Sequence, residues 1–165
     1  MRIISIDPGY ERLGIAVIEK LPKQKTLDKT QGKEVLIFSE CFKTKSTLPH
    51  EKRLGLIGEE IEKIIKKYKP EVLATEKLFF SGNQKTAMLV AEARGVILYT
   101  GQKLGLKIFE YRPNEVKIAI TGYGASEKRQ IIEMVKKLIV CDQISNSDDE
   151  FDAIAIGLTH FAINK

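Results

Sequence analysis

The sequence is poor in the residues that bind soft metals or form disulfides. It has two cysteines, two histidines and no tryptophan among its 165 residues. Cys41 and Cys141 lie far apart and neither belongs to a C-x-x-C motif, so we interpret both as reduced structural thiols. His50 and His160 are equally separated, which excludes a zinc site built from histidine and cysteine. Any metal ion would therefore need oxygen ligands.

Long apolar runs are also missing. No stretch reaches the roughly 20 residues of a membrane-spanning helix, and Met1-Arg2 leads into a β-type run rather than a signal peptide. We therefore expect a cytoplasmic protein with no membrane partner. A chain with 43% hydrophobic and 30% charged residues is typical of one globular domain, here 1–165. The net charge of +5 suits a polyanionic partner, but ordinary basic proteins carry as much.

The first twenty residues predict two antiparallel strands joined by a short loop. An apolar run at 3–6 ends in Asp7, turns through Pro8 and Gly9, and returns through Leu13–Ile18. Because this run is apolar almost throughout, we expect a central strand that is covered on both faces. Aspartate before Pro-Gly also starts many ordinary turns. Asp7 therefore indicates chemistry only if other acids converge on it.

The rest of the chain predicts an α/β fold. A strand that follows a crossover helix runs parallel to its neighbour, so three antiparallel strands should be followed by two parallel ones. The predicted elements are a strand at Val35–Phe42, a helix at His50–Tyr68, a strand at Val72–Thr75, a helix at Gln84–Leu104, a strand at Leu106–Glu110, and helices at Pro113–Ile120, Ser126–Val140 and Asp148–Ile163. The Gln84–Leu104 helix is apolar on more than one face, which predicts core burial or packing on a second subunit.

A second carboxylate, Glu76, follows the Val72–Thr75 strand as Asp7 follows the first strand. Parallel neighbours end at the same edge of a sheet, so the two acids are expected side by side. The alternative is that Glu76 is simply a solvated acid after a strand. The interpretation depends on further acids from the end of the chain.

The last predicted helix supplies those acids. Ser147 and Glu150 have the spacing of a capping box, which starts the helix at about Asp148. Asp149 and Asp152 then lie one turn apart on one side. The helix dipole alone explains an acid in the first turn, such as Asp149. It does not explain Asp152 in an apolar helix, because a buried carboxylate is costly unless a cation holds it.

Four clustered carboxylates repel one another unless they share a cation. Oxygen ligands of this kind favour Mg²⁺ or Mn²⁺, and two such ions are used by many enzymes that hydrolyse phosphodiesters. Lys117 and Lys128 flank the Gly122–Gly124 turn and are placed to contact phosphates, although most lysines are only solvated. Phe79 and Phe80 follow Glu76 and are candidates for stacking on bases or for a core anchor.

Several motifs together resemble RuvC-type Holliday-junction resolvases. They are I-D-P-G-Y-E-R-L-G-I-A-V-I, A-T-E-K-L-F-F-S-G-N, A-R-G-V-I-L, E-Y-R-P-N-E-V-K, G-Y-G-A-S-E-K and D-D-E-F-D-A-I-A-I-G-L-T-H, in order along nearly the whole chain. The resemblance implies a ribonuclease-H-like fold with a five-stranded mixed sheet, antiparallel in strands 1–3 and parallel in strands 4 and 5, flanked by helices. It also implies a homodimeric Mg²⁺-dependent endonuclease that nicks two opposing strands of a four-way DNA junction symmetrically.

Residue by residue, the resemblance implies that four acids bind metal: Asp7, Glu76, Asp149 and Asp152. It assigns phosphate contacts to Lys117 and Lys128 and base contact to Phe79, and we add Phe80 and Arg129 as candidate DNA-binding residues. It further implies cooperation with a junction-binding protein and a branch-migration motor of RuvA and RuvB type. The lysine-rich Leu21–Glu34 segment is longer than the family pattern.

Two other functions were compatible with parts of the sequence. An actin-like ATPase also opens on a strand-turn-strand with an aspartate, but it needs a second such domain, for which 165 residues leave no room. A non-catalytic junction-binding or RNA-binding relative would keep the fold and lose the metal. The four acids argue against that alternative.

Overall fold

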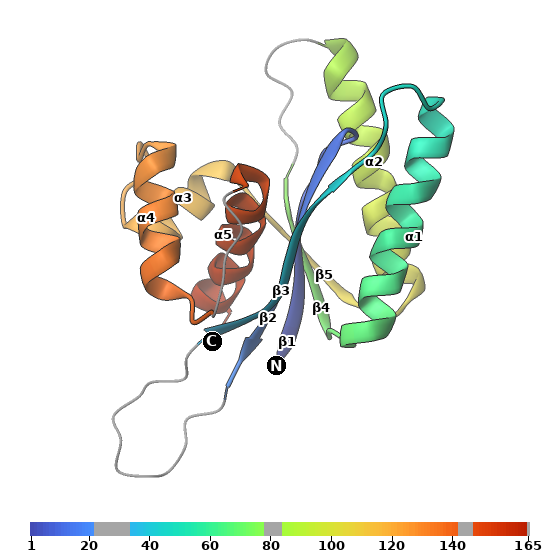
Figure 1. Cartoon of the computed structure of the whole chain (residues 1–165). Coiled ribbons are helices and arrows are strands. Elements are labelled where there is room, and N and C mark those ends of the chain that lie inside the picture. Colours follow the sequence, from blue (N-terminus) through green and yellow to red (C-terminus); the bar gives the residue numbers. More distant parts are fainter. Residues whose placement is uncertain (22–33, 78–83, 142–146, 165) are drawn as a thin grey trace.

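Five strands form one mixed sheet that separates two layers of helices (Figure 1). The computed structural model describes residues 1–21, 34–77, 84–141 and 147–164. The strands are β1 (Arg2–Asp7), β2 (Arg12–Lys20), β3 (Glu34–Lys43), β4 (Val72–Glu76) and β5 (Lys107–Tyr111), in the spatial order β3-β2-β1-β4-β5. The pairs β1·β2 and β2·β3 are antiparallel, whereas β1·β4 and β4·β5 are parallel. This arrangement confirms the predicted sheet.

The helices divide between the two faces of the sheet. One face carries α1 (His50–Tyr68) and α2 (Gln84–Lys103), and the other carries α3 (Pro113–Thr121), α4 (Lys128–Leu138) and α5 (Asp148–Ile163). Each observed element begins and ends within two residues of its prediction. A search of the described helices finds none with the length and apolar character needed to cross a lipid bilayer.

The central strand β1 is buried on both faces, as its apolar run predicted. Ile4 and Ile6 pack in the cluster under α1 and α2, while Ile3 packs in the cluster under α5. Close contact between α5 and the sheet depends on Gly157, because a Cβ there would lie 2.7 Å from the Ser5 Oγ. The middle of α5 is thereby held against β1 and β2.

The helix α5 begins at the predicted residue, but the predicted capping box is wrong. Ser147 is the N-cap residue and makes no side-chain capping hydrogen bond; its hydroxyl donates to the Asp149 carboxylate at 3.3 Å instead. The carboxylate of Glu150 accepts a hydrogen bond from Ser39 on β3 at 2.7 Å. Neither side chain therefore forms the box, because Ser147 contacts Asp149 in the same turn and Glu150 contacts the sheet.

Candidate active site

Two carboxylates leave the sheet side by side at the ends of β1 and β4. Ile6 pairs with Thr75 in the parallel register, and Asp7 and Glu76 are the next residues of their strands. The buried Thr75 hydroxyl donates to the Ile6 carbonyl at 2.9 Å, which fixes the two strand ends to each other. The structure thus places these two acids together at one edge of the sheet.

The first turns of α5 bring two more carboxylates to the same edge. The backbone of β2 at Gly14 lies so close to α5 that a Cβ there would sit 2.0 Å from the Asp149 carbonyl oxygen. Asp152 lies one turn further on and, with Glu76, lines one cavity. A glycine in β2 therefore permits the approach of α5 that brings Asp149 and Asp152 to the sheet.

Asp7 lies near enough to the other three acids for their negative charges to affect its pKa. The pKa of Asp7 is raised from the usual 3.8 to about 8, and burial is the largest cause. Neighbouring carboxylates contribute further to this rise, Asp152 first and then Glu76 and Asp149. The ammonium group of Lys128 opposes it. The acids therefore act on one another across a shared space, as close like charges do.

The other acids are perturbed in different directions. Burial raises the pKa of Glu76, and the negative charge of Asp152 adds to the shift. Burial also raises the pKa of Asp152, although its hydrogen bond with Lys128 acts in the opposite direction. Burial acts to raise the pKa of Asp149, but hydrogen bonds from Arg12 and Cys41 hold it below its usual range.

Two cations neutralise part of this negative cluster. The Lys128 Nζ lies 2.7 Å from an Asp152 carboxylate oxygen and 3.7 Å from that of Asp148. The Arg12 guanidinium donates from Nε and Nη2 to one oxygen of Asp149, with the Nε contact at 2.8 Å. The Cys41 thiol donates to the same oxygen at 3.2 Å. Lys128 belongs to α4 and Arg12 to β2, whereas the acids that they bind belong to α5.

The donor set at this edge fits a divalent cation of the Mg²⁺ type, since every acid offers oxygen and the cluster has excess negative charge. Within the described residues, no three His, Cys, Asp or Glu side chains already converge as a metal-binding group. Arg12 and Lys128 each hold one of the carboxylates, Asp149 and Asp152 respectively. An ion bound by all four acids would compete with these two cations.

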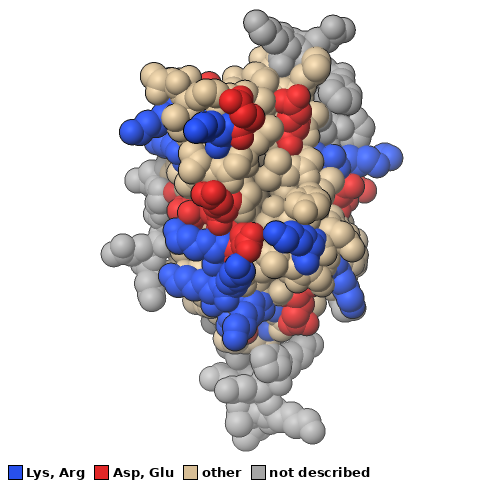
Figure 2. Space-filling model, turned by 90° about the vertical axis from the view of Figure 1, so that its right-hand side faces the viewer, with Lys and Arg blue, Asp and Glu red and all other residues tan. Residues whose placement is uncertain are grey.

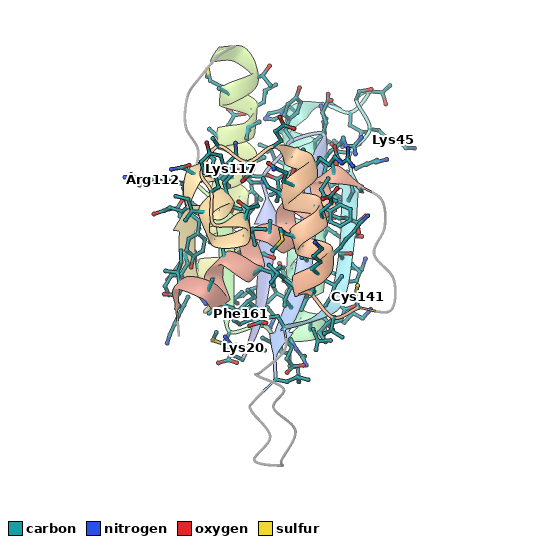
Figure 3. The ribbon with its side chains drawn as sticks, turned by 90° about the vertical axis from the view of Figure 1, so that its left-hand side faces the viewer. Lys20, Lys45, Arg112, Lys117, Cys141 and Phe161 are labelled. Carbon is teal, nitrogen blue, oxygen red and sulfur yellow. The ribbon has the colours of Figure 1, made fainter. Side chains whose placement is uncertain are left out.

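The predicted DNA-binding residues are distributed unevenly. Lys117 lies on α3 and lines the same cavity as Glu76 and Asp152, and Figure 3 shows it at the end of the molecule opposite Lys20. The exposed Arg129 pairs with Glu133 on its own helix at 3.0 Å instead of approaching the acids. Phe79 and Phe80 lie outside the described residues.

Sequence reasoning missed the residues that support the Asp7 turn. Arg53 of α1 is buried, with its guanidinium 4.8 Å from the Tyr10 ring centroid and its Nε donating to the Thr44 hydroxyl at 2.9 Å. The Thr44 hydroxyl in turn donates to the Tyr10 carbonyl at 2.7 Å. No local pattern marks such residues, because their partners are distant in sequence. Arg12 was missed for the same reason.

A mixed sheet of this order, with acids at the ends of β1 and β4 and on the last helix, defines a protein of the ribonuclease-H-like class. The family model of the crossover junction endodeoxyribonuclease RuvC matches residues 3–160. The chain belongs to this RuvC family. It is 42% identical over 160 residues to the crossover junction endodeoxyribonuclease RuvC of Fusobacterium nucleatum, covering 97% of this chain and 80% of that protein.

Solved structures agree with this assignment. The Thermus thermophilus RuvC structure superimposes with a TM-score of 0.85 at 29% identity, covering 98% of this chain and 94% of that one. The structure of T. thermophilus RuvC in complex with a Holliday junction substrate gives a TM-score of 0.83 at 26% identity, with the same coverage. The recognition from sequence motifs and the predicted fold class are therefore confirmed.

Proposed function

We propose that this protein is a structure-specific endonuclease that resolves four-way DNA junctions in recombination and repair. Membership in the RuvC family and the relative solved on a Holliday junction support this substrate. The observation that carries the proposal is the carboxylate edge, where burial and neighbouring acids raise the pKa of Asp7 to about 8. Such an edge attracts a divalent cation, and the bound cation then lets a negatively charged phosphodiester approach, which repulsion between the acids and the phosphate would otherwise exclude.

In this proposal Asp7, Glu76, Asp149 and Asp152 hold the metal, with Mg²⁺ as the expected ion and Mn²⁺ as a substitute. Two ions per site would supply an activated water and stabilise the leaving oxygen of the cleaved phosphodiester. The protein's own part is to hold the acids in place. The Gly14 approach sets the position of α5, and the Thr75 hydrogen bond sets the two strand ends.

Two lysines contribute positive charge at the same edge. Lys128 already lies 2.7 Å from Asp152, so it moves to a phosphate oxygen when the metal takes its place. Lys117 lines the adjoining cavity and contacts a neighbouring phosphate. Arg129, fully at the surface of α4, makes a more distant contact with the DNA backbone. The aromatic residues Phe79 and Phe80 engage bases at the junction centre.

Symmetric cleavage further requires a homodimer, since a four-way junction presents two equivalent strands to two equivalent sites. The face of α1 and α2 supports this part of the proposal. Met88 and Tyr99 of α2 are 63% and 67% exposed, and Leu56 of α1 is also exposed. Figure 2 shows uncharged surface between the charged side chains of this face. Sedimentation at micromolar concentration tests whether the protein is a dimer, and a monomer would contradict paired nicking.

The remaining parts of the proposal follow from this role. Residues 1–165 act as one nuclease domain, because elements from β1 to α5 pack around a single sheet. The protein works in the cytoplasm, where a junction-binding protein and a branch-migration motor of RuvA and RuvB type deliver the junction. A pull-down with these two proteins on junction DNA tests the partnership.

The decisive experiment incubates a labelled synthetic junction with the protein and Mg²⁺, with linear duplex as the control substrate. Wild type is expected to cut the junction at opposed strands and to leave duplex intact. Asp7→Asn should still bind the junction and fail to cut it, because it loses a metal ligand while keeping the shape. Asp148→Asn is the control, since Asp148 is an exposed acid in the first turn of α5, next to Asp149. Equal cleavage by Asp7→Asn would remove Asp7 from the site.

The junction-cleavage experiment and a nucleotide titration separate the alternative functions. A non-catalytic junction-binding relative would bind the junction without cutting it under any divalent ion. An actin-like ATPase would bind nucleotide, which a nucleotide titration would detect.

A further inference from the structure

A small cavity adjoins the carboxylate edge on the side of α3 and α4. Its volume is about 160 Å³. Glu76 and Asp152 line one part of it and Lys117 another. Its apolar lining includes Val116 of α3, Ile131 of α4 and Ala155 of α5, beside Pro113 and Ile156. None of these apolar residues has a part in binding metal or phosphate.

We propose that this cavity, which we call the α3 pocket, holds one ring of the nucleotide that adjoins the scissile phosphate. The ring is either the deoxyribose or the base, because each presents uncharged carbon-rich ring faces to an apolar wall. This inference rests on the proposed junction cleavage and adds to it a contact that positions the cleaved strand. It makes Val116 a substrate-positioning residue.

The size of the α3 pocket limits its occupant to a single ring. An apolar cavity of about 150 Å³ in another protein holds one benzene molecule, and the α3 pocket is of that size at about 160 Å³. Pockets for drug-sized ligands begin at roughly 300 Å³. A whole nucleoside therefore does not fit, whereas one five- or six-membered ring does.

The chemistry of the walls selects the same occupant. A hydrated cation or a phosphate gains little from Val116, Ile131 and Ala155, because charged groups lose their hydration against apolar walls. A sugar or base ring gains from the same contact by burying apolar surface. Apolar walls thus favour the uncharged part of a nucleotide over its phosphate.

The position of the α3 pocket ties this ring to the reacting phosphate. Glu76 and Asp152 line the pocket and belong to the carboxylate edge, where the scissile phosphate binds in the proposed function. Lys117 lines it too and is placed to bind a second phosphate. A ring covalently attached between two phosphates of one strand satisfies both contacts. The neighbouring nucleotide is the one group of the substrate with that connection.

The test fills the pocket and compares it with a matched surface change. Val116→Phe adds a ring within the cavity, whereas Ile118→Phe adds the same ring on the same helix at a side chain that is 49% exposed and lies outside the pocket lining. Since one methylene in an apolar pocket changes kcat/KM by about 10- to 200-fold, Val116→Phe should lower junction cleavage at least about tenfold. Ile118→Phe should stay within about twofold of wild type. Val116→Ala enlarges the pocket without adding atoms, and it replaces Val116→Phe as the test of the pocket if Val116→Phe fails to fold.

Junctions with an abasic site on one or the other side of the scissile phosphate identify the ring. If the base occupies the pocket, one abasic position should lower cleavage by the wild-type protein. The same abasic site should not lower cleavage by Val116→Phe any further, and it should lower cleavage by Val116→Ala less than it does for wild type. If the sugar occupies it, abasic sites leave wild-type cleavage unchanged while both Val116 variants lower it. Both results support the α3 pocket.

Other results would overturn the inference. Cleavage by folded Val116→Phe at the wild-type rate, or by Val116→Ala at that rate with an unchanged abasic effect, would show that no ring enters the pocket. The proposed junction cleavage would survive that result, because wild type would still cut. A wild-type protein that cuts no junction would instead refute the proposed function and the pocket with it.

Discussion

The substitution Asp7→Asn should stabilise the metal-free protein at alkaline pH. Because burial and neighbouring acids raise the pKa of Asp7 to about 8, its charged form is favoured in the unfolded chain. Protonated Asp7 therefore contributes its full share to the free energy of unfolding below pH 3.8, and this contribution is lost as the pH rises towards 8. Asparagine cannot ionise and has almost the same shape, so the free energy of unfolding of the variant does not fall in this way as the pH rises.

The size of the effect follows from the shift. At about 1.4 kcal/mol per pKa unit, the full shift from 3.8 to about 8 corresponds to about 6 kcal/mol, which is an upper limit. Asp7 is half-buried and lies near Lys128, so solvent and local rearrangement reduce the difference. We expect Asp7→Asn to unfold with a free energy about 2 kcal/mol higher than that of wild type at pH 8, with no difference near pH 4.

The assay is urea unfolding in EDTA at several pH values, repeated with excess Mg²⁺. The metal should stabilise wild type, because it binds the folded state alone, and should stabilise Asp7→Asn much less. The advantage of the variant at pH 8 should therefore shrink or reverse when Mg²⁺ is added. A metal-free variant that is less stable than wild type at pH 8, or equal stabilisation of both by Mg²⁺, would refute this reasoning.

Three further predictions concern the supports of the site. In thermal melts, Gly14→Ala should lower the free energy of unfolding by about 2 kcal/mol, since its Cβ would lie 2.0 Å from the Asp149 carbonyl oxygen. The control Gly55→Ala, which has open space around it, should be neutral or stabilising by up to about 1 kcal/mol. Lys128→Met should lower metal-free stability by about 1 kcal/mol and increase the gain from Mg²⁺, because the ammonium no longer competes with the ion; an unchanged gain in calorimetric scans would contradict this. Arg53→Met should cost about 2 kcal/mol in urea unfolding by removing the contacts to Tyr10 and Thr44, with Arg53→Lys intermediate; equal losses in the two variants would show that geometry at this position is unimportant.

The fold was predictable because its strong signals are local. The apolar run before Asp7 predicts a central strand, and the period of the apolar residues in His50–Tyr68 predicts α1, both of which the structure confirms. The parallel register that places Asp7 beside Glu76 follows from the crossover helix. These features depend on neighbours in sequence or on general rules of chain connection.

The supports of the site were not predictable, because they depend on contacts between distant segments. Arg12 binds Asp149 from the other end of the chain, and no spacing rule links the two. The capping box at Ser147 failed for the same reason, since Ser39 of β3 reaches Glu150 and removes one of its two partners. A local pattern is overridden wherever tertiary packing offers a better hydrogen bond.

The most direct test of the central claim is calorimetric titration of Mn²⁺ into the wild-type protein and its acid variants without DNA. We expect wild type and the Asp148→Asn control to bind the ion, and Asp7→Asn, Glu76→Gln, Asp149→Asn and Asp152→Asn each to bind it more weakly by at least about tenfold. Equal affinity in all six proteins would mean that the acids at this sheet edge do not share a cation.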